Sequence, residues 1–340
     1  MTNEDHLDKE TSLSVQVTEN GVSGKAKSRA IAAADRLVGN LSEWINVRLE
    51  DGNAQRRAKI EGEVALIKAA ADYGIKQIGE DPEFANRMLE NQFRKMSEAQ
   101  LNKDAVFSEA LEDLKQNPPS DDEANAGPEE IDPTFMHRFE TYAEGASTEE
   151  LQQRWGRVLA TEVRSPGGFS VKVLRVVDEL SSETALLFER LCESRIANVL
   201  PKYLVGELSL SERSALVTAG LMLEPGLGQI SQFREITDNA GAELFFWGIN
   251  HIGLAIEKPI DINAFKKISP GTDGTHGINV YILTDAGVAI SSILPNSEDA
   301  AMRRLIGELK TEIPIASLRE YRRDKSASDW NRTMRWGGGT

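Results

Sequence analysis

The sequence is poor in the residues that build covalent cross-links and metal sites. Of its 340 residues one is a cysteine, Cys192, and four are histidines. One cysteine cannot form an intramolecular disulfide, and the Cys-rich ligand sets of structural zinc sites are missing. The histidines share no metal-binding spacing; they are His6, His137, His251 and His276. The sequence therefore predicts no metal, no cofactor and a reducing, cytoplasmic setting.

Recognisable catalytic motifs are also lacking. Cys192 lies in an apolar helical stretch and is expected to be a buried, inert thiol. Residues 226–228 lack the third glycine of a dinucleotide fingerprint, and residues 271–277 lack the Lys-Ser/Thr of a P-loop. The sequence therefore predicts no enzymatic activity and no catalytic residue. A hydrolase whose carboxylates meet only in the fold stays open as a third possibility.

Long hydrophobic runs are absent as well. The longest apolar stretch, residues 242–256, is interrupted by Asn250 and His251. It is shorter than the roughly 20 residues that cross a bilayer. The first ten residues are acidic and polar, unlike a secretory signal or a transit peptide. We therefore expect no transmembrane segment.

The formal net charge of -15 is concentrated in two segments. Residues 1–24 carry -4 and residues 117–150 carry -9, whereas residues 25–116 and 151–340 carry -1 each. The first segment has the composition of a disordered acidic tail. Because the parts expected to fold are nearly neutral, the total charge neither favours nor excludes an anionic partner.

Residues 25–116 have the pattern of long amphipathic helices that form a hairpin. Apolar residues recur every three or four positions as far as Trp44 and again over residues 60–78. Residues 79–82, Gly-Glu-Asp-Pro, are typical of one helix ending and the next one beginning. The returning helix is predicted to run to about Gln116.

Residues 117–133 are acidic and rich in proline, which predicts an extended linker and a domain boundary. Residues 134–200 are expected to form a helical bundle. One of its helices should start at a capping box, Ser147 to Glu150. The last residues, 324–340, are predicted to be a flexible tail.

Residues 201–323 are expected to form a winged-helix-like α+β domain with a small β-sheet. A helix follows a capping box at Ser209, apolar β-rich runs come next, and Thr284 can cap a closing helix. More than 60 residues separate Leu221 from Thr284, which is more than a simple wing needs. The fold class predicted for the whole chain is α+β, mainly α.

Residues 131–191 carry a distinctive motif of three helices and a loop. An Asp-x-x-hydrophobic-x-x-Phe helix precedes a Trp-x-x-Leu/Val-Leu-Ala-x-Glu helix, a Pro-Gly-x-Phe-Ser loop and a Leu-rich helix. The corresponding residues are Asp132, Phe139, Trp155, Leu159, Ala160, Glu162, Pro166, Gly167, Phe169 and Ser170.

This stretch resembles a bacterial family known only as a domain of unknown function, which is distantly like helical proteins of abortive infection and phage defence. The resemblance implies no activity. A structural interpretation accounts for the motif. Trp155 and Phe169 would pack, Pro166 and Gly167 would turn the chain, and Ser170 would cap the next helix.

Two segments have the charge of binding surfaces. Residues 319–335 carry a net +3 with Trp330 interleaved, which is typical of nucleic-acid contact. The candidate contacts are Arg319, Arg322, Arg323 and Lys325. Residues 25–48 also carry +3 and could lie on a membrane surface or in a partner groove, but core packing is the favoured interpretation.

The leading functional hypothesis is a non-catalytic interaction protein. Its helical hairpin would bind a protein partner or a second copy of the chain. Long rows of apolar side chains along a helix are more stable when another surface buries them. The alternative is a nucleic-acid-binding regulator or phage-defence component that acts through the winged-helix-like domain.

Overall fold

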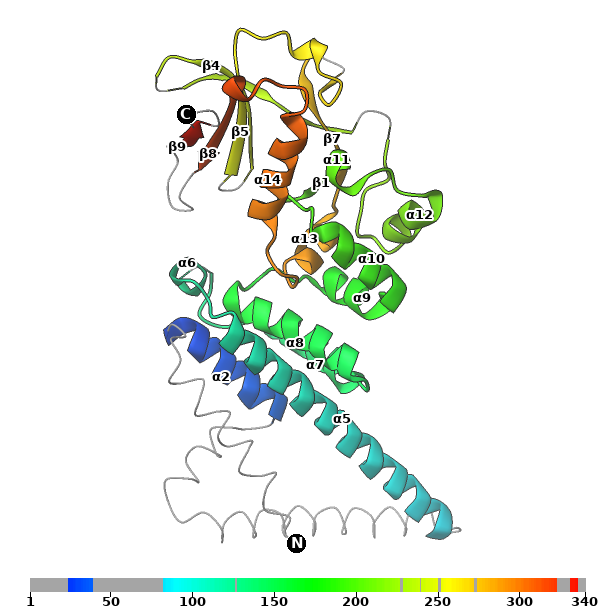
Figure 1. The fold of residues 1–340 in the computed structure, drawn as a ribbon. Helices are drawn as coiled ribbons and strands as arrows, with labels where there is room; N and C mark the ends of the chain where they lie inside the picture. The colour runs from blue at the N-terminus through cyan, green and yellow to red at the C-terminus, as the bar shows by residue number, and fades with distance from the viewer. Residues whose placement is uncertain are drawn as a thin grey trace, which may run out of the picture. The chain divides into compact units, whose positions relative to one another are not determined.

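The computed structural model describes most of the chain after residue 81 and one helix before it. The described ranges are 24–38, 82–125, 127–226, 229–238, 240–249, 252–271, 274–322 and 331–335. The chain divides into two compact units, Met1–Leu174 and Arg175–Thr340 (Figure 1). The fold is α+β and mainly helical, which confirms the predicted class. Within these ranges, none of the helices combines the length and the apolar content that a bilayer crossing requires.

The described part of the first unit is helical. Its elements are α2 (Gly24–Val38), α5 (Pro82–Gln116), α6 (Asp121–Asn125), α7 (Pro133–Glu144), α8 (Glu149–Arg164) and the start of α9 (Val171–Glu179). The long helix α5 packs against α2, α7 and α8. At the centre of the unit the Trp155 ring stacks on Tyr142 at 5.0 Å and meets the edge of Phe139 at 5.7 Å. These aromatic contacts hold α7 against α8.

The helix starts of this unit follow from local capping. Pro133 occupies the first turn of α7, where Asp132 accepts a hydrogen bond from the N–H of Thr134. Thr148 caps α8 and accepts from the N–H of Leu151. The predicted capping box at Ser147 is therefore one residue early. The Ser147 N–H instead donates to the carbonyl of Gly145, in the turn that precedes the helix.

The predicted hairpin is described in part. In α2 the stripe residues Ala30, Ala34 and Leu37 are buried, and α5 ends at Gln116, the position that the apolar spacing predicts. Trp44 lies outside the described residues. Residues 60–78 also lie outside the described residues. So does the expected disordered tail, residues 1–24, except for Gly24, which begins α2.

Segment 117–133, expected to be an extended linker, contains the short helix α6. Pro119 and Ala124 are buried, and the Arg29 guanidinium donates to the Ala124 carbonyl at 2.9 Å. The segment packs within the first unit, and the division into compact units falls between Leu174 and Arg175.

The second unit combines short helices with two antiparallel sheets. The helices are α10 (Ser182–Cys192), α11 (Lys202–Val205), α12 (Leu210–Thr218), α13 (Asp285–Ser291) and α14 (Glu298–Leu309). The strands are β1 (Val199–Pro201), β2 (Ile230–Gln232), β3 (Arg234–Thr237), β4 (Glu243–Ile249), β5 (Ile252–Glu257), β6 (Ser269–Pro270), β7 (His276–Ile282), β8 (Leu318–Arg322) and β9 (Asn331–Arg335).

The smaller sheet has the order β1-β7-β2, and β6 also pairs with β7. The helix before β2, α12, begins at a complete capping box between Ser209 and Glu212. After β7, Thr284 accepts from the N–H of Gly287 and starts α13. Both caps lie where the sequence predicts them.

The larger sheet explains the long spacing between Leu221 and Thr284. Its order is β3-β4-β5-β8-β9. Strands β3, β4 and β5 lie in the chain between β2 and β7, and the C-terminal strands β8 and β9 complete the sheet. Helix α14 shares its core, in which Leu254, Leu305 and Leu318 are fully buried.

Candidate interaction surface

Helix α5 presents the same apolar face along its two halves, but the other helices that the structure describes cover only one half. Met88 and Val106 are 18 positions apart, as are Met96 and Leu114. Since about 18 residues make five helical turns, each pair lies on one line along the helix. Val106 and Leu114 are 0% and 2% exposed, whereas Met88 and Met96 are 54% and 59% exposed.

We call residues 82–99 the α5 arm. In Figure 1 this cyan part of α5 extends beyond α2, α7 and α8. Eighteen residues give the arm a length of roughly 27 Å. The apolar face therefore continues along a part of α5 that extends beyond the other described helices of the first unit.

A polar band separates the arm from the packed half of α5. The Gln100 side-chain amide donates to the Leu37 carbonyl at 3.3 Å, and the Asn102 amide donates to the Glu144 carbonyl at 2.8 Å. These carbonyls lie in the last turns of α2 and α7, where the helix itself supplies no donor. The band thus caps both neighbouring helices where they end against α5.

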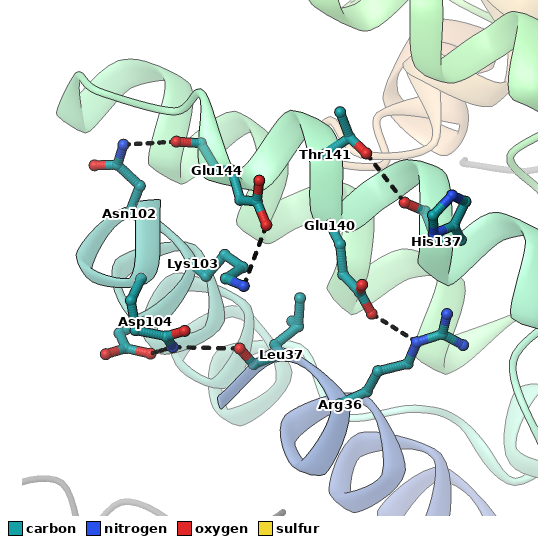
Figure 2. Close-up of polar contacts among 10 residues, drawn as sticks. Arg36, Leu37, Asn102, Lys103, Asp104, His137, Glu140, Thr141 and Glu144 are labelled. Atoms are coloured by element: carbon teal, nitrogen blue, oxygen red, sulfur yellow. Dashed lines mark hydrogen bonds and ion pairs between the residues drawn. The ribbon is translucent and has the colours of Figure 1, made fainter. Parts of the chain in front are cut away.

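Ion pairs reinforce this arrangement at the surface. Figure 2 shows Lys103 directed to the Glu144 carboxylate, at 3.3 Å, and Arg36 directed to Glu140, at 2.6 Å. Burial raises the pKa of Asp104, although the Gln100 hydrogen bond and the Lys103 charge lower it. Each pair joins α7 to α5 or α2, so the band fixes the point from which the arm projects.

Charges of both signs cover the exposed sides of the arm. The exposed charged residues are Arg87, Glu90, Arg94, Lys95 and Glu98. With Glu83 counted as well, residues 82–99 hold three cations and three anions, so the arm is formally neutral. Two arms can therefore approach each other without strong like-charge repulsion.

The motif residues gather around the end of α8. Trp155 and Leu159 are each 1% exposed. The Glu162 carboxylate, also 1% exposed, accepts hydrogen bonds from the N–H groups of Gly167 at 2.6 Å and Phe169 at 3.2 Å. Burial raises the pKa of Glu162, and these hydrogen bonds oppose the shift.

The rest of the motif forms the loop that Glu162 holds. Pro166 precedes Gly167, which adopts a φ of +93° that favours glycine. Phe169 is buried, and the Ser170 hydroxyl accepts from the Val173 N–H at 3.4 Å as α9 begins. The contacts that the structure gives these residues lie within the motif and its flanking helices.

The basic residues considered for nucleic-acid contact are Arg319, Arg322, Arg323 and Lys325. Arg319 is 3% exposed and pairs with Glu257. Arg322 pairs with Asp299 and Glu320, each at 3.0 Å, and the hydrogen bond to Asp299 raises its pKa. The other two lie outside the described residues. Both described arginines thus direct their charge to carboxylates of their own unit.

The described side chains that could carry chemistry are dispersed. In the ranges that the structure covers, no three His, Cys, Asp or Glu side chains form a group that could hold a metal ion. Burial raises the pKa of Cys192 to about 12. Because the thiolate is the reactive form, this thiol is a poor nucleophile at neutral pH.

Comparison with known proteins covers one part of the chain. A family described as "Protein of unknown function (DUF2806)" matches residues 86–202. Neither the curated proteins nor the solved structures gave a match. The match begins in the α5 arm, includes the motif around Glu162 and ends at the start of α11. The resemblance of this part of the chain to a domain of unknown function is thereby confirmed.

Proposed function

We propose that this chain is a non-catalytic interaction protein that self-associates through the α5 arm. Residues 60–78, the other helix of the expected hairpin, lie outside the described residues. The observation that carries the proposal is the change in exposure along one helical face, from 2% at Leu114 to 59% at Met96.

Self-association would bury the apolar face of the α5 arm, as α2, α7 and α8 already bury the same face in the other half of α5. Burying a methionine side chain contributes about 1.5–3 kcal/mol relative to exposing it. Because Met88 and Met96 are 54% and 59% exposed rather than fully exposed, each would contribute roughly half of that to the free energy of a dimer. The nearly neutral charge of the arm supports a second copy as the partner.

The oligomeric state at several concentrations tests the proposal. We expect sedimentation velocity to show a dimer for the wild type and a monomer for Met88→Glu/Met96→Glu, because burying two carboxylates is costly. The matched control is Leu101→Glu. Leu101 is 64% exposed on the same helix, but it lies about 140° around the axis from Met96.

A strictly monomeric wild type would contradict self-association. A wild-type dimer that persists in the double variant would contradict the assignment of the interface to the arm.

A second candidate function is nucleic-acid binding through a winged-helix-like arrangement in the second unit. The order β1-β7-β2, with α12 before β2, supports it. The charge gives it little support, because the second unit has 18 Lys/Arg against 22 Asp/Glu, a net -4. A role in regulation or phage defence would follow from this candidate and rests on the family resemblance alone.

Titration with labelled duplex DNA at low and moderate salt tests this candidate. If α12 contacts the duplex, affinity should fall steeply with salt, and Ser214→Glu on its exposed face should weaken binding. Ser182→Glu, exposed at the start of α10, is the matched control. Binding that is absent, or that does not respond to salt, would exclude the candidate.

A further inference from the structure

Helix α2 packs on α5, α6 and α8 with a face of small side chains. Its buried apolar residues are Ala26, Ala30, Ala33, Ala34 and Leu37. Helix α8, in the same unit, instead buries Trp155, Val158, Leu159 and Val163. Because each alanine removes little apolar surface from water, burial holds α2 much less firmly than it holds α8.

One buried arginine makes the deepest attachment of α2. The Arg29 side chain is 0% exposed, and its guanidinium donates to the carbonyls of Val163 at 2.8 Å and Ala124 at 2.9 Å. A longer contact, 3.4 Å, reaches the Arg164 carbonyl. The acceptors lie in the last turns of α8 and α6, and the carbonyl end of a helix attracts a cation.

The other described polar attachments of α2 are the 3.3 Å hydrogen bond from the Gln100 amide to the Leu37 carbonyl and two ion pairs at the surface. Lys25 is 3.9 Å from Glu129, and Arg36 pairs with Glu140 at 2.6 Å. Both pairs are partly exposed, and exposed ion pairs contribute little to stability. Arg29 is therefore the contact on which the docking of α2 depends most.

We infer that α2 is a releasable strap: it undocks from α5, α6 and α8 by local opening while those helices stay folded, and Arg29 sets how often it is docked. Release uncovers the carbonyls at the ends of α6 and α8. This inference does not depend on the proposed self-association, since it rests on the contacts that α2 makes with α6 and α8.

Hydrogen exchange of the full-length chain, read by mass spectrometry, tests the strap. In the wild type, amides of residues 26–37 should exchange at least about tenfold faster than those of residues 155–159. Arg29→Met should accelerate exchange in α2 by a further tenfold or so and leave residues 155–159 unchanged. The exchange rate of α2 in Arg29→Lys should be intermediate, because a single ammonium replaces a guanidinium that donates to two carbonyls.

Ser28→Ala is the matched control on the same helix. Ser28 is exposed beside Arg29, and alanine favours the helix, so α2 should exchange no faster than in the wild type. Equal wild-type rates in α2 and α8 would overturn the strap. A parallel acceleration of both segments in Arg29→Met, or failure of that variant to fold, would overturn it as well, because either result makes α2 an integral part of the core.

Discussion

Gly156 lies where α8 crosses α5. A Cβ placed there would be 2.5 Å from the Cβ of Glu109 and 3.0 Å from the backbone nitrogen of Ala110. We expect Gly156→Ala to lower the free energy of unfolding by about 1–3 kcal/mol through overpacking. Urea unfolding followed by circular dichroism measures the change. Gly145→Ala is the control, because its nearest atom is 3.5 Å away, and a similar loss in both variants would contradict this explanation.

Glu162 should make a stability contribution that grows as the pH falls. Burial raises its folded-state pKa above the ordinary 4.5, so the folded chain binds this proton more tightly than the unfolded chain. The stability contribution of Glu162 is then fully present below its pKa in the unfolded chain. It is lost as the pH rises through its pKa in the folded chain. We therefore expect Glu162→Gln to cost more stability at about pH 5 than at about pH 7.5.

The measurement is the difference in unfolding free energy between wild type and Glu162→Gln at the two pH values. The titration of most other carboxylates contributes equally to the unfolding free energy of both proteins and therefore cancels in this difference. A difference that shrinks toward acid would show that the hydrogen bonds from Gly167 and Phe169 outweigh burial.

Single residues differ in how far the sequence predicts their roles. The turn at Gly167 and the cap at Ser170 were predicted because each residue type meets a requirement of its own backbone. The role of Arg29 was missed, because its acceptor Val163 is 134 positions away. The sequence signal was a lone arginine within the apolar stripe of α2, and a helical wheel alone does not identify its partner.

Helix α5 offers a comparison between matched positions on one face. We expect Leu114→Ala to cost about 2–4 kcal/mol of unfolding free energy, because it leaves a cavity in the bundle. Met96→Ala, five turns earlier, should change the stability of the monomer by less than about 0.5 kcal/mol. Urea unfolding at low protein concentration measures both. Equal losses would mean that the arm is packed within its own chain.

Helices were more predictable than sheets in this chain. The end of α5 at Gln116 and the capping box at Ser209 depend on neighbours a few positions away. The capping of α8 was displaced by one residue because two hydroxyl residues, Ser147 and Thr148, adjoin. The larger sheet was not predicted, because β5 pairs with β8 across more than 60 residues and no local pattern encodes that pairing.

The division of the molecule into two units makes a prediction about its single thiol. Cys192 lies in the second unit, is 5% exposed and has a pKa raised to about 12. In the native chain, we expect labelling by a thiol reagent at about pH 8 to be at least a hundredfold slower than in the urea-unfolded chain.

Gly156→Ala, in the first unit, should leave this native labelling rate unchanged if the second unit opens independently. An accelerated rate in that variant would show that the two units open together. The same experiment thus measures whether a substitution in the first unit alters the opening of the second unit.

The length of α5 also determines what a partner at its tip experiences. Between Met88 and Gln116 the helix rises roughly 42 Å. Ions in physiological buffer attenuate a charge over about 8 Å. The carboxylates of residues 117–150 account for most of the molecule's net negative charge. Those nearest Gln116 are several such distances from Met88, whereas Glu144 pairs with Lys103, about 22 Å along the helix from Met88. Dimer formation there should consequently respond weakly to ionic strength, despite a formal charge of -15 on each copy.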